Sequence, residues 1–289
     1  MASLDVVRVP DWSGQEWLIH GFSTRTGGKT TVYRPGKTDL NLGFTASDDP
    51  DNVTANRGLF VSAATGGKEI LGMVTLRQIH SPLIRRVAAD DINTSLKGDG
   101  LLTDQPGVLL GIQTADCIPV LVADRKNRAV AAFHAGWRGT LARIVENGVG
   151  RMRLEFGSKP ENLIASIGPG IGQCCYSVGD EVREQFESQF PYAPELFHEV
   201  YDSDPVKEKY PMLFLTARAP GHSELGPGMH LDLVEANRRQ LRAAGLKKGS
   251  IFVTGQCTGC NTDRFFSHRM EQGFTGRMMS VIGILPTEA

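Results

Sequence analysis

Two histidines and one cysteine, each inside a short polar motif, carry the chemistry that this sequence offers. A thiolate and two imidazoles are ligands that zinc accepts, and three protein ligands leave the fourth position of a tetrahedral site open, as in catalytic zinc sites. The sequence therefore predicts a zinc site, on the condition that folding brings the three side chains together. The ligands are His80, Cys117 and His134, in the motifs Arg77-Gln78-Ile79-His80, Thr114-Ala115-Asp116-Cys117 and His134-Ala135-Gly136-Trp137-Arg138-Gly139.

The stretch between Cys117 and His134 is typical of a β-hairpin. Two apolar runs flank the polar residues 124–127. With those four residues as the loop, Ala123 faces Arg128, and counting outward in antiparallel register places Cys117 opposite His134. Directly opposed Cβ atoms lie about 5 Å apart, which suits two ligands of one metal ion.

Each ligand taken singly has a simpler interpretation. A histidine that follows a strand-like stretch is more often structural, and Cys117, which precedes Ile-Pro-Val-Leu-Val, is typical of a cysteine that fills a core. The hairpin register joins Cys117 to His134, whereas only ligand chemistry joins His80 to them.

The composition favours small-molecule chemistry. The 289 residues are 40% hydrophobic and 22% charged, with a formal net charge of −1 and a pI of about 6.7, so neither nucleic acid nor membrane is an expected partner. The N-terminus lacks a basic start followed by an apolar core, and no apolar run approaches the roughly 20 residues of a membrane span. Five cysteines, an odd number, argue against a disulfide framework. A reducing cytoplasm fits best.

Apolar stretches separated by glycine-rich turns predict a strand-rich segment up to about residue 135, followed by helices that alternate with strands. Strands are expected at residues 17–22, 70–75, 83–87 and 108–112 and in the hairpin. A last apolar strand at 278–285 is expected to complete a sheet.

Two helices and a long excursion are expected in the middle of the chain. Apolar residues with helical spacing follow Thr140, which is a plausible cap. A second helix is expected to begin near Val178 and to end before Pro191. Residues 191–230 are rich in proline and glycine, which predicts an extended surface excursion or a rim of the active site.

A third helix has signals at both ends. Asp232 followed by Glu235 resembles a capping box, and Gly245 stands where a helix terminates. Val234, Leu241 and Ala244 would form its apolar face.

The motif that begins at His134 lies where a strand is expected to pass into a helix. Backbone N–H groups at a helix start, two glycines and Arg138 would make an anion site beside the metal, with phosphate as the obvious anion. A tight turn with Trp137 packed over it is the structural alternative, and both can hold together. Basic residues near the C-terminus either line an anionic pocket or solvate a loop: Arg264, His268, Arg269 and Arg277.

The remaining four cysteines occur as two pairs. Cys257 and Cys260 have the spacing of half a structural zinc site or of a thiol redox pair, but no second Cys-x-x-Cys exists, which favours two reduced thiols in a loop. Cys174 and Cys175 follow a glycine-rich stretch that matches no nucleotide-binding fingerprint and is expected to shape a pocket wall. Adjacent cysteines are not expected to reach one metal easily.

Taken together, the motifs resemble those of the YfiH or laccase-domain family, now regarded as zinc-dependent purine nucleoside phosphorylases after an earlier label of multicopper polyphenol oxidase. The resemblance covers nearly the whole chain. It rests on the three motifs above and on Ser23-Thr24-Arg25, Leu40-Asn41-Leu42-Gly43, Ile167-Gly168-Pro169, Cys174-Cys175-Tyr176, Leu231-Asp232-Leu233, Phe266-Ser267-His268-Arg269 and Thr275-Gly276-Arg277.

The resemblance implies a fold and an activity. The fold would be a single α/β domain over residues 1–289, layered α/β/β/α with mixed sheets. The activity would be phosphorolysis of adenosine, inosine, guanosine and methylthioadenosine to free base and pentose 1-phosphate, with deamination of adenosine as a possible second reaction. The implied cofactor is Zn²⁺, held by His80, Cys117 and His134, and the implied partners are purine nucleosides and phosphate.

Five further residues are candidates for the reaction. Asp116, beside the cysteine, is a candidate general acid/base or a residue that orients a ligand histidine. If Cys117 and His134 lie on one sheet face, strand alternation turns Asp116 to the other face, which favours a structural role. Substrate contacts are expected from Arg25, Asn41, Gln78 and Arg138.

Three other functions remain open at this point. A metal-free cysteine hydrolase or deamidase would use Cys117 as nucleophile and His134 as base, for which the same hairpin register is suitable. A copper polyphenol oxidase would need several coppers, which one three-ligand site cannot assemble. A structural zinc-binding protein would need a fourth ligand, because closed sites take four.

Overall fold

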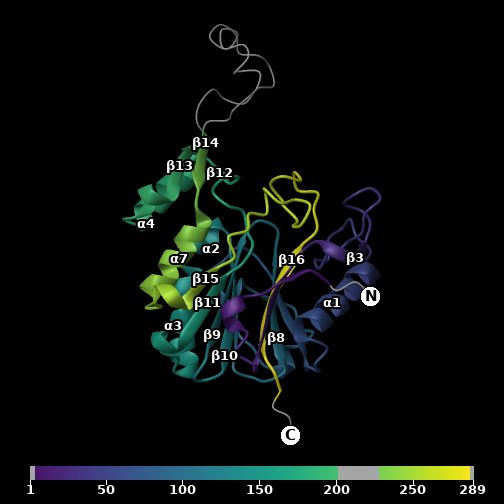
Figure 1. Cartoon of the computed structure of the whole chain (residues 1–289). Helices are drawn as coiled ribbons and strands as arrows, with labels where there is room; N and C mark the ends of the chain where they lie inside the picture. The colour runs from purple at the N-terminus through teal and green to yellow at the C-terminus, as the bar shows by residue number, and fades with distance from the viewer. Residues whose placement is uncertain (1–3, 201–227, 287–289) are drawn as a thin grey trace.

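All the described strands except β3 (Thr26–Thr30) form two six-stranded sheets and one three-stranded sheet. The computed structural model describes residues 4–200 and 228–286 (Figure 1). In spatial order, the first sheet contains β1 (Val6–Val7), β2 (Leu18–Ser23), β16 (Met278–Ile284), β8 (Val108–Thr114), β4 (Gly72–Arg77) and β6 (Leu96–Lys97). The second contains β15 (Ile251–Val253), β11 (Leu163–Ile167), β9 (Ile118–Asp124), β10 (Ala129–Ala135), β7 (Gly100–Thr103) and β5 (Ile84–Arg86). The small sheet contains β12 (Ser177–Val178), β14 (Gly228–Leu231) and β13 (Phe197–Val200).

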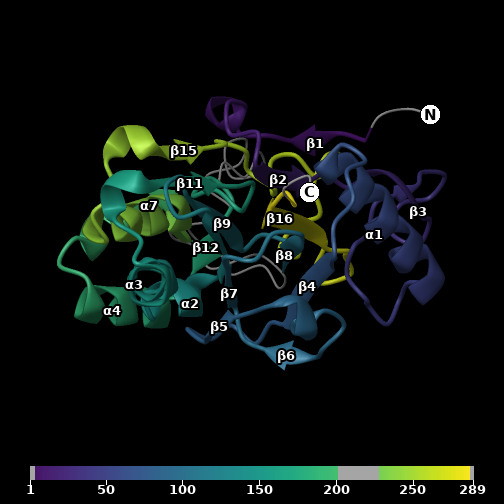
Figure 2. The same ribbon diagram turned by 90° about the horizontal axis from the view of Figure 1, so that it is seen from below.

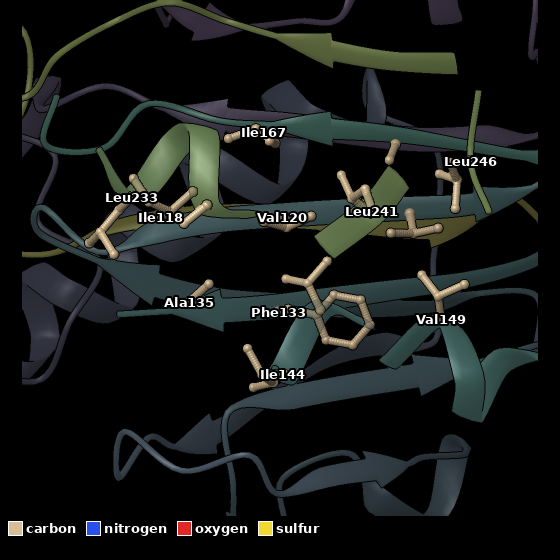
Figure 3. Packing of buried hydrophobic residues seen from close by; sticks show 14 of the residues in the cluster. Ile118, Val120, Phe133, Ala135, Ile144, Val149, Ile167, Leu233, Leu241 and Leu246 are labelled. Carbon is tan, nitrogen blue, oxygen red and sulfur yellow. The ribbon is translucent and has the colours of Figure 1, made fainter. Parts of the chain in front are cut away.

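The two large sheets pack face to face, and their shared interior explains the continuous apolar runs of the sequence. In β9, Val120 and Val122 pack toward α3 (Ile144–Phe156) and α7 (Leu233–Ala243), whereas Leu121 and Ala123 pack against the first sheet. A strand buried on both faces has no polar side to alternate with. Figure 3 shows the helix-facing layer, with Phe133 of β10 among residues of α3 and α7. Both large sheets are mixed, since β4 runs parallel to β8 and β11 parallel to β15, while most neighbours are antiparallel.

Helix α1 (Pro50–Thr65) covers the outer face of the first sheet, opposite α3 and α7 (Figure 2). Its Phe60 and Ala64 pack with residues of β2, β8 and β16. The order of layers is therefore α/β/β/α, which confirms the expected fold class. The sequence did not predict α1, because its buried face includes Asn56, which is held by hydrogen bonds to Thr30 Oγ1 and to backbone oxygens instead of by apolar contact.

The other helices follow their terminal signals with one exception. α7 begins after Asp232, whose side chain accepts a hydrogen bond from Glu235 N (2.8 Å), and α4 (Asp180–Gln189) ends before Pro191, as expected. The helix expected after Thr140 begins earlier, as α2 (Trp137–Leu141), and breaks before α3 because Arg143 adopts a left-handed backbone with φ of 57°. Thr140 is therefore inside α2 and is not a cap.

The C-terminal strand β16 completes the first sheet from inside, between β2 and β8, and not at an edge. The expected excursion at 191–230 begins with a short helix, η4 (Ala193–Leu196), and strand β13 and returns as β14, which pairs antiparallel with β13. Residues 201–227 lie outside the described residues. Among the helices of the described chain, none is long and apolar enough to cross a membrane.

Candidate metal centre and its cavity

The hairpin of β9 and β10 forms, but with a register different from the predicted one. Asp124 stays in β9, where its carboxylate accepts hydrogen bonds from the backbone N–H groups two and three residues ahead (2.9 and 3.1 Å), so the loop comprises residues 125–128. His134 therefore lies opposite Pro119, and Cys117 lies just before β9. The predicted Cys117–His134 pairing is wrong, because this local turn of Asp124 moves the loop by one residue.

His80, Cys117 and His134 nevertheless come together. His80 follows β4, Cys117 precedes β9, and His134 is near the end of β10. Their three ligand atoms lie within 4.8 Å of one another, and Cys117 Sγ is 4.0 Å from His80 Nε2. The two imidazole rings meet edge to face with centroids 4.9 Å apart. Such a set of two nitrogens and one sulfur could hold one metal ion.

A cavity of about 410 Å³ contains the trio. That volume is within the range of roughly 300–1,000 Å³ for ligand pockets. Two of the basic residues near the C-terminus, His268 and Arg277, face it, which agrees with the pocket-lining alternative for them. The lining residues are Leu76, Arg77, Gln78, His80, Gln113, Thr114, Ala115, Cys117, His134, His268 and Arg277.

Asp99, which the sequence analysis missed, connects two of the three ligands. Its fully buried carboxylate accepts a hydrogen bond from His134 Nδ1 (2.8 Å) and others from the backbone N–H groups of His80 (3.0 Å) and Ser81 (2.7 Å). Neutral His134 with its proton on Nδ1 presents Nε2 to the trio, and a carboxylate behind a ligand histidine is typical of metal sites. The only sequence signal was an aspartate between two glycines, Gly98 and Gly100, ahead of an apolar strand.

The ionisable groups of the site are strongly coupled. Burial alone would raise the pKa of Asp99, but hydrogen bonds from His134 and Ser81 outweigh burial and lower that pKa to about 2. Burial would also raise the pKa of the Cys117 thiol, yet His134 and His80 lower it to about 6. Burial would lower the pKa of His134, whereas Cys117 and Asp99 raise it to about 9. These opposite shifts favour a thiolate beside an imidazolium in the metal-free site.

The backbone around the trio is shaped for close approach. His80 and Asp116 both have positive φ values, 56° and 88°, although neither is glycine. A positive φ at a residue other than glycine costs free energy. It persists where the surrounding structure enforces it, which is often at functional sites. A Cβ atom at Gly136 would lie 2.9 Å from Cys117 Sγ and 3.2 Å from His80 Cδ2, so only glycine leaves room for the ligands here.

Asp116 is bound by two loops from the C-terminal part of the chain. Its Oδ1 accepts from Thr258 Oγ1 and its Oδ2 from Arg269 N, both at 2.7 Å. Its backbone oxygen accepts from Ile171 N (2.7 Å). These bonds hold the turn that carries Cys117. A role of Asp116 as general acid/base or as a residue that orients a ligand histidine stays a prediction.

Gln78 is the one predicted substrate contact that lines the cavity. Its Nε2 donates to the backbone oxygen of Gln113 (2.7 Å), and its Oε1 accepts from Gln113 N (2.8 Å). This pairing fixes β4 to β8 at the cavity wall. Gln113, directly before the motif of Cys117, also lines the cavity, although no pattern in the sequence indicated it.

Arg25 and Asn41 lie outside the cavity lining. Arg25 is buried, forms ion pairs with Asp39 (3.2 Å) and Glu271 (2.9 Å), and stacks on Phe266. The Oδ1 of Asn41 accepts from the backbone N–H of Arg277 (2.8 Å). Asn41 is therefore linked to the cavity through the backbone of Arg277, which lines it.

Arg138 lies on α2, exposed, with its guanidinium 4.3 Å above the ring of Trp137. It is not among the residues that line the cavity. Burial and the Cys117 charge raise the pKa of the Tyr176 phenol to about 12, while Arg269 and Arg138 oppose the shift. The strand passes into a helix at Gly136, as expected, and a phosphate contact of Arg138 stays a prediction.

Comparisons with known proteins identify the family of this chain. Residues 19–285 match the sequence model of the family described as multi-copper polyphenol oxidoreductase laccase. The purine nucleoside phosphorylase YlmD of Geobacillus stearothermophilus is 34% identical over 274 residues, which cover 92% of this chain and 89% of that protein. A protein from an unknown prokaryotic organism, named adenosine deaminase RL5, is 32% identical over 259 residues, with coverage of 87% and 88%.

A solved structure has the same fold. The crystal structure of the hypothetical protein YfiH of Bacillus licheniformis superposes with a TM-score of 0.79 at 32% identity and covers 99% of this chain and 97% of that one. Sequence match and fold thus extend over almost the entire chain. The protein belongs to the family described as multi-copper polyphenol oxidoreductase laccase, whose similar members include proteins named purine nucleoside phosphorylase.

Proposed function

We propose that this protein is a zinc-dependent purine nucleoside phosphorylase that acts on adenosine, inosine, guanosine and methylthioadenosine. The observation that carries the proposal is a three-ligand site, oriented by the buried Asp99, that opens onto a cavity containing arginine side chains. The names of similar proteins support the same activity. One imidazole-imidazole-thiolate set with room for a fourth ligand suits zinc in a catalytic role.

Phosphorolysis breaks the C1′–N9 bond of the nucleoside and forms a bond from C1′ to a phosphate oxygen, while the departing base takes up a proton. Arg77 and Arg277 line the cavity and would bind the phosphate through charge-assisted hydrogen bonds. Holding phosphate beside C1′ turns an encounter of two solutes into an oriented reaction. Zinc, when bound by the trio, would supply a Lewis acid that polarises a substrate oxygen.

We expect Arg277→Met to raise the KM for phosphate about 10-fold to 150-fold, because a hydrogen bond to a charged group contributes roughly 1.5–3 kcal/mol. Steady-state kinetics with varied phosphate measure the effect. The matched control is Arg264→Met, since Arg264 pairs with Asp5 (2.8 Å) and is not among the lining residues. An unchanged KM for phosphate in Arg277→Met would remove this residue from the proposed site.

Zinc affinity should rise with pH between neutrality and about pH 9. The pKa of Cys117 is lowered to about 6 and that of His134 raised to about 9, so in this window the metal-free site keeps one proton on His134 that the zinc-bound site has lost. Because the free state binds more protons, affinity increases about tenfold per pH unit for that proton and levels off above the pKa of His134. Competition with a chromophoric chelator at several pH values measures the slope. A flat profile would contradict the imidazolium assignment.

A metal-free cysteine hydrolase is the second candidate, and one observation favours it. Cys117, His134 and Asp99 have the order of nucleophile, base and orienting acid, with a lowered pKa for the thiol. His80 separates the two functions, because it would bind the metal but has no part in such a triad. Metal analysis of wild type and His80→Ala, together with sensitivity to iodoacetamide, distinguishes them.

The decisive assay incubates the protein, shown to contain zinc, with adenosine, inosine, guanosine and methylthioadenosine in the presence and absence of phosphate. Chromatography identifies the products. Free base and pentose 1-phosphate that form only with phosphate support phosphorolysis. Inosine formed from adenosine without phosphate reveals the deamination that the name of RL5 raises. Inactivity on every one of these nucleosides would overturn the proposal.

A further inference from the structure

Four cysteines that the proposed reaction does not use lie together on two loops. Cys174 and Cys175 follow β11, Cys257 and Cys260 follow β15, and all four sulfur atoms lie within 4.8 Å of one another. Cys260 Sγ is 3.3 Å from that of Cys174 and 3.4 Å from that of Cys175. The expectation that the two adjacent cysteines do not reach one metal easily is therefore wrong, because both belong to one group that could hold a metal ion. The sequence hid the cluster because its second pair is Cys-Cys and not Cys-x-x-Cys.

We propose that Cys174, Cys175, Cys257 and Cys260 bind a second, structural zinc ion, separate from the trio in the cavity. Zinc–sulfur bonds of 2.3 Å in a tetrahedron place neighbouring sulfur atoms about 3.8 Å apart, within the spread seen here. Tetrahedral sets of four sulfurs are typical of zinc or of iron–sulfur clusters, and zinc, unlike a cluster, needs no inorganic sulfide. Four ligands close the site, in contrast to the three ligands of the catalytic one.

The two loops are built to bring these sulfurs close. The backbone N–H of Gly172 donates a hydrogen bond to Cys257 Sγ (3.2 Å), a contact that favours the thiolate form that binds zinc. A Cβ at Gly172 would lie 3.3 Å from Cys174 Sγ, and one at Gly259 would lie 3.0 Å from Cys175 Sγ. Gly172 thus leaves room for a sulfur atom of its own loop, and Gly259 leaves room for one of the other loop.

The backbone aligns the loops before any ligand is added. Strands β11 and β15 run parallel, so both loops leave the same end of the sheet. The parallel arrangement continues as a bridge between Gly170 and Cys257, and Thr258 N donates to Gly170 O (3.0 Å). A closed zinc site with two ligands from each loop would tie the ends of this pair together.

The proposed zinc also has a structural consequence for the catalytic trio. Thr258, between two of the ligands in sequence, donates to the carboxylate of Asp116 (2.7 Å), and Ile171 donates to the backbone oxygen of Asp116 (2.7 Å). One loop thus holds the side chain of Asp116 and the other holds its backbone. Because Asp116 directly precedes Cys117, the tetrathiolate site would position a ligand of the catalytic metal through these loops.

The first test is the zinc content of protein purified without chelator under reducing conditions, as in the cytoplasm that the sequence predicts. We expect two zinc ions per wild-type chain, one in His80→Ala and one in the double variant Cys174→Ser/Cys260→Ser. Wild-type protein with a single zinc that is lost in His80→Ala would overturn the proposal, as would iron at the cysteines or a disulfide between the two loops found by peptide mapping.

A second measurement remains decisive if the double variant does not fold. His80→Ala, reconstituted with cobalt, should show the intense sulfur-to-metal charge-transfer and visible bands of a tetrahedral cobalt tetrathiolate. Cys117→Ser serves as the matched cysteine control, because it removes a sulfur from the trio and leaves the four-cysteine cluster intact. Absence of these bands in both folded variants would refute the second site. Neither readout depends on phosphorolysis, so the proposed activity and the structural zinc can fail separately.

Discussion

His80→Ala is expected to lose its catalytic zinc and with it phosphorolysis. Loss of an outer hydrogen-bonding partner of a ligand lowers metal affinity about 10-fold to 100-fold. The variant removes one of the three ligands themselves, so the zinc affinity of the trio should fall by more than that. Loss of one preorganised electrostatic group typically lowers kcat about 10²-fold to 10³-fold, and loss of a metal should do at least as much. Zinc titration and nucleoside phosphorolysis measure both effects.

The control for this variant is His198→Ala, an exposed histidine on β13 outside the cavity lining. It should keep full zinc content and activity. Retention of both properties by His80→Ala would exclude the trio as the metal site. Retained activity after loss of the zinc of the trio would instead favour the triad of Cys117, His134 and Asp99, in which His80 has no role.

Asp99→Asn should weaken zinc binding about 10-fold to 100-fold without removing a ligand. The carboxylate accepts hydrogen bonds from His134 Nδ1 and from three backbone N–H groups, those of Ile79, His80 and Ser81. An amide must turn its NH₂ group toward one of these donors. The result is either a His134 ring that no longer presents Nε2 correctly or an unsatisfied buried donor, which costs about 1–3 kcal/mol.

The Asp99→Asn variant has a second readout that a merely structural role would not move. Asp99 helps to raise the pKa of His134, so its loss should lower that pKa and shift to lower pH the point at which zinc affinity levels off. Asp90→Asn, a change at an exposed aspartate, is the control and should leave the pH profile unchanged. A variant that lowers thermal stability but keeps the wild-type zinc affinity and pH profile would reduce Asp99 to a folding role.

The local signals in the sequence were sufficient for much of the fold. The apolar runs became strands because such segments bury best between layers, and Asp232 begins α7 because its side chain satisfies a free N–H within reach along the chain. Helix α1 was not predicted because no local signal marked its buried face. The hydrogen-bond partners of the buried Asn56 are distant in sequence.

For the candidate metal centre, the sequence by itself determined the ligand chemistry: one thiol and two imidazoles in three motifs of unusual composition. Only the tertiary structure decided how they meet. The predicted hairpin register was wrong because the loop lies one residue later than expected. The carboxylate of Asp124 accepts hydrogen bonds from two backbone N–H groups of the turn. The position of His80 could not be predicted from spacing along the chain. Its backbone N–H donates to Asp99, which lies in a different loop.

The same limit applies to the four remaining cysteines and to Asp99. Side chains from loops that are far apart in sequence become neighbours only when parallel strands such as β11 and β15 carry them to one edge. Hydrogen bonds and sulfur contacts act over a few ångströms in space, whereas sequence spacing measures distance only along the chain. Residue types therefore fixed which chemistry is possible, and the packing of the two sheets decided which residues perform it together.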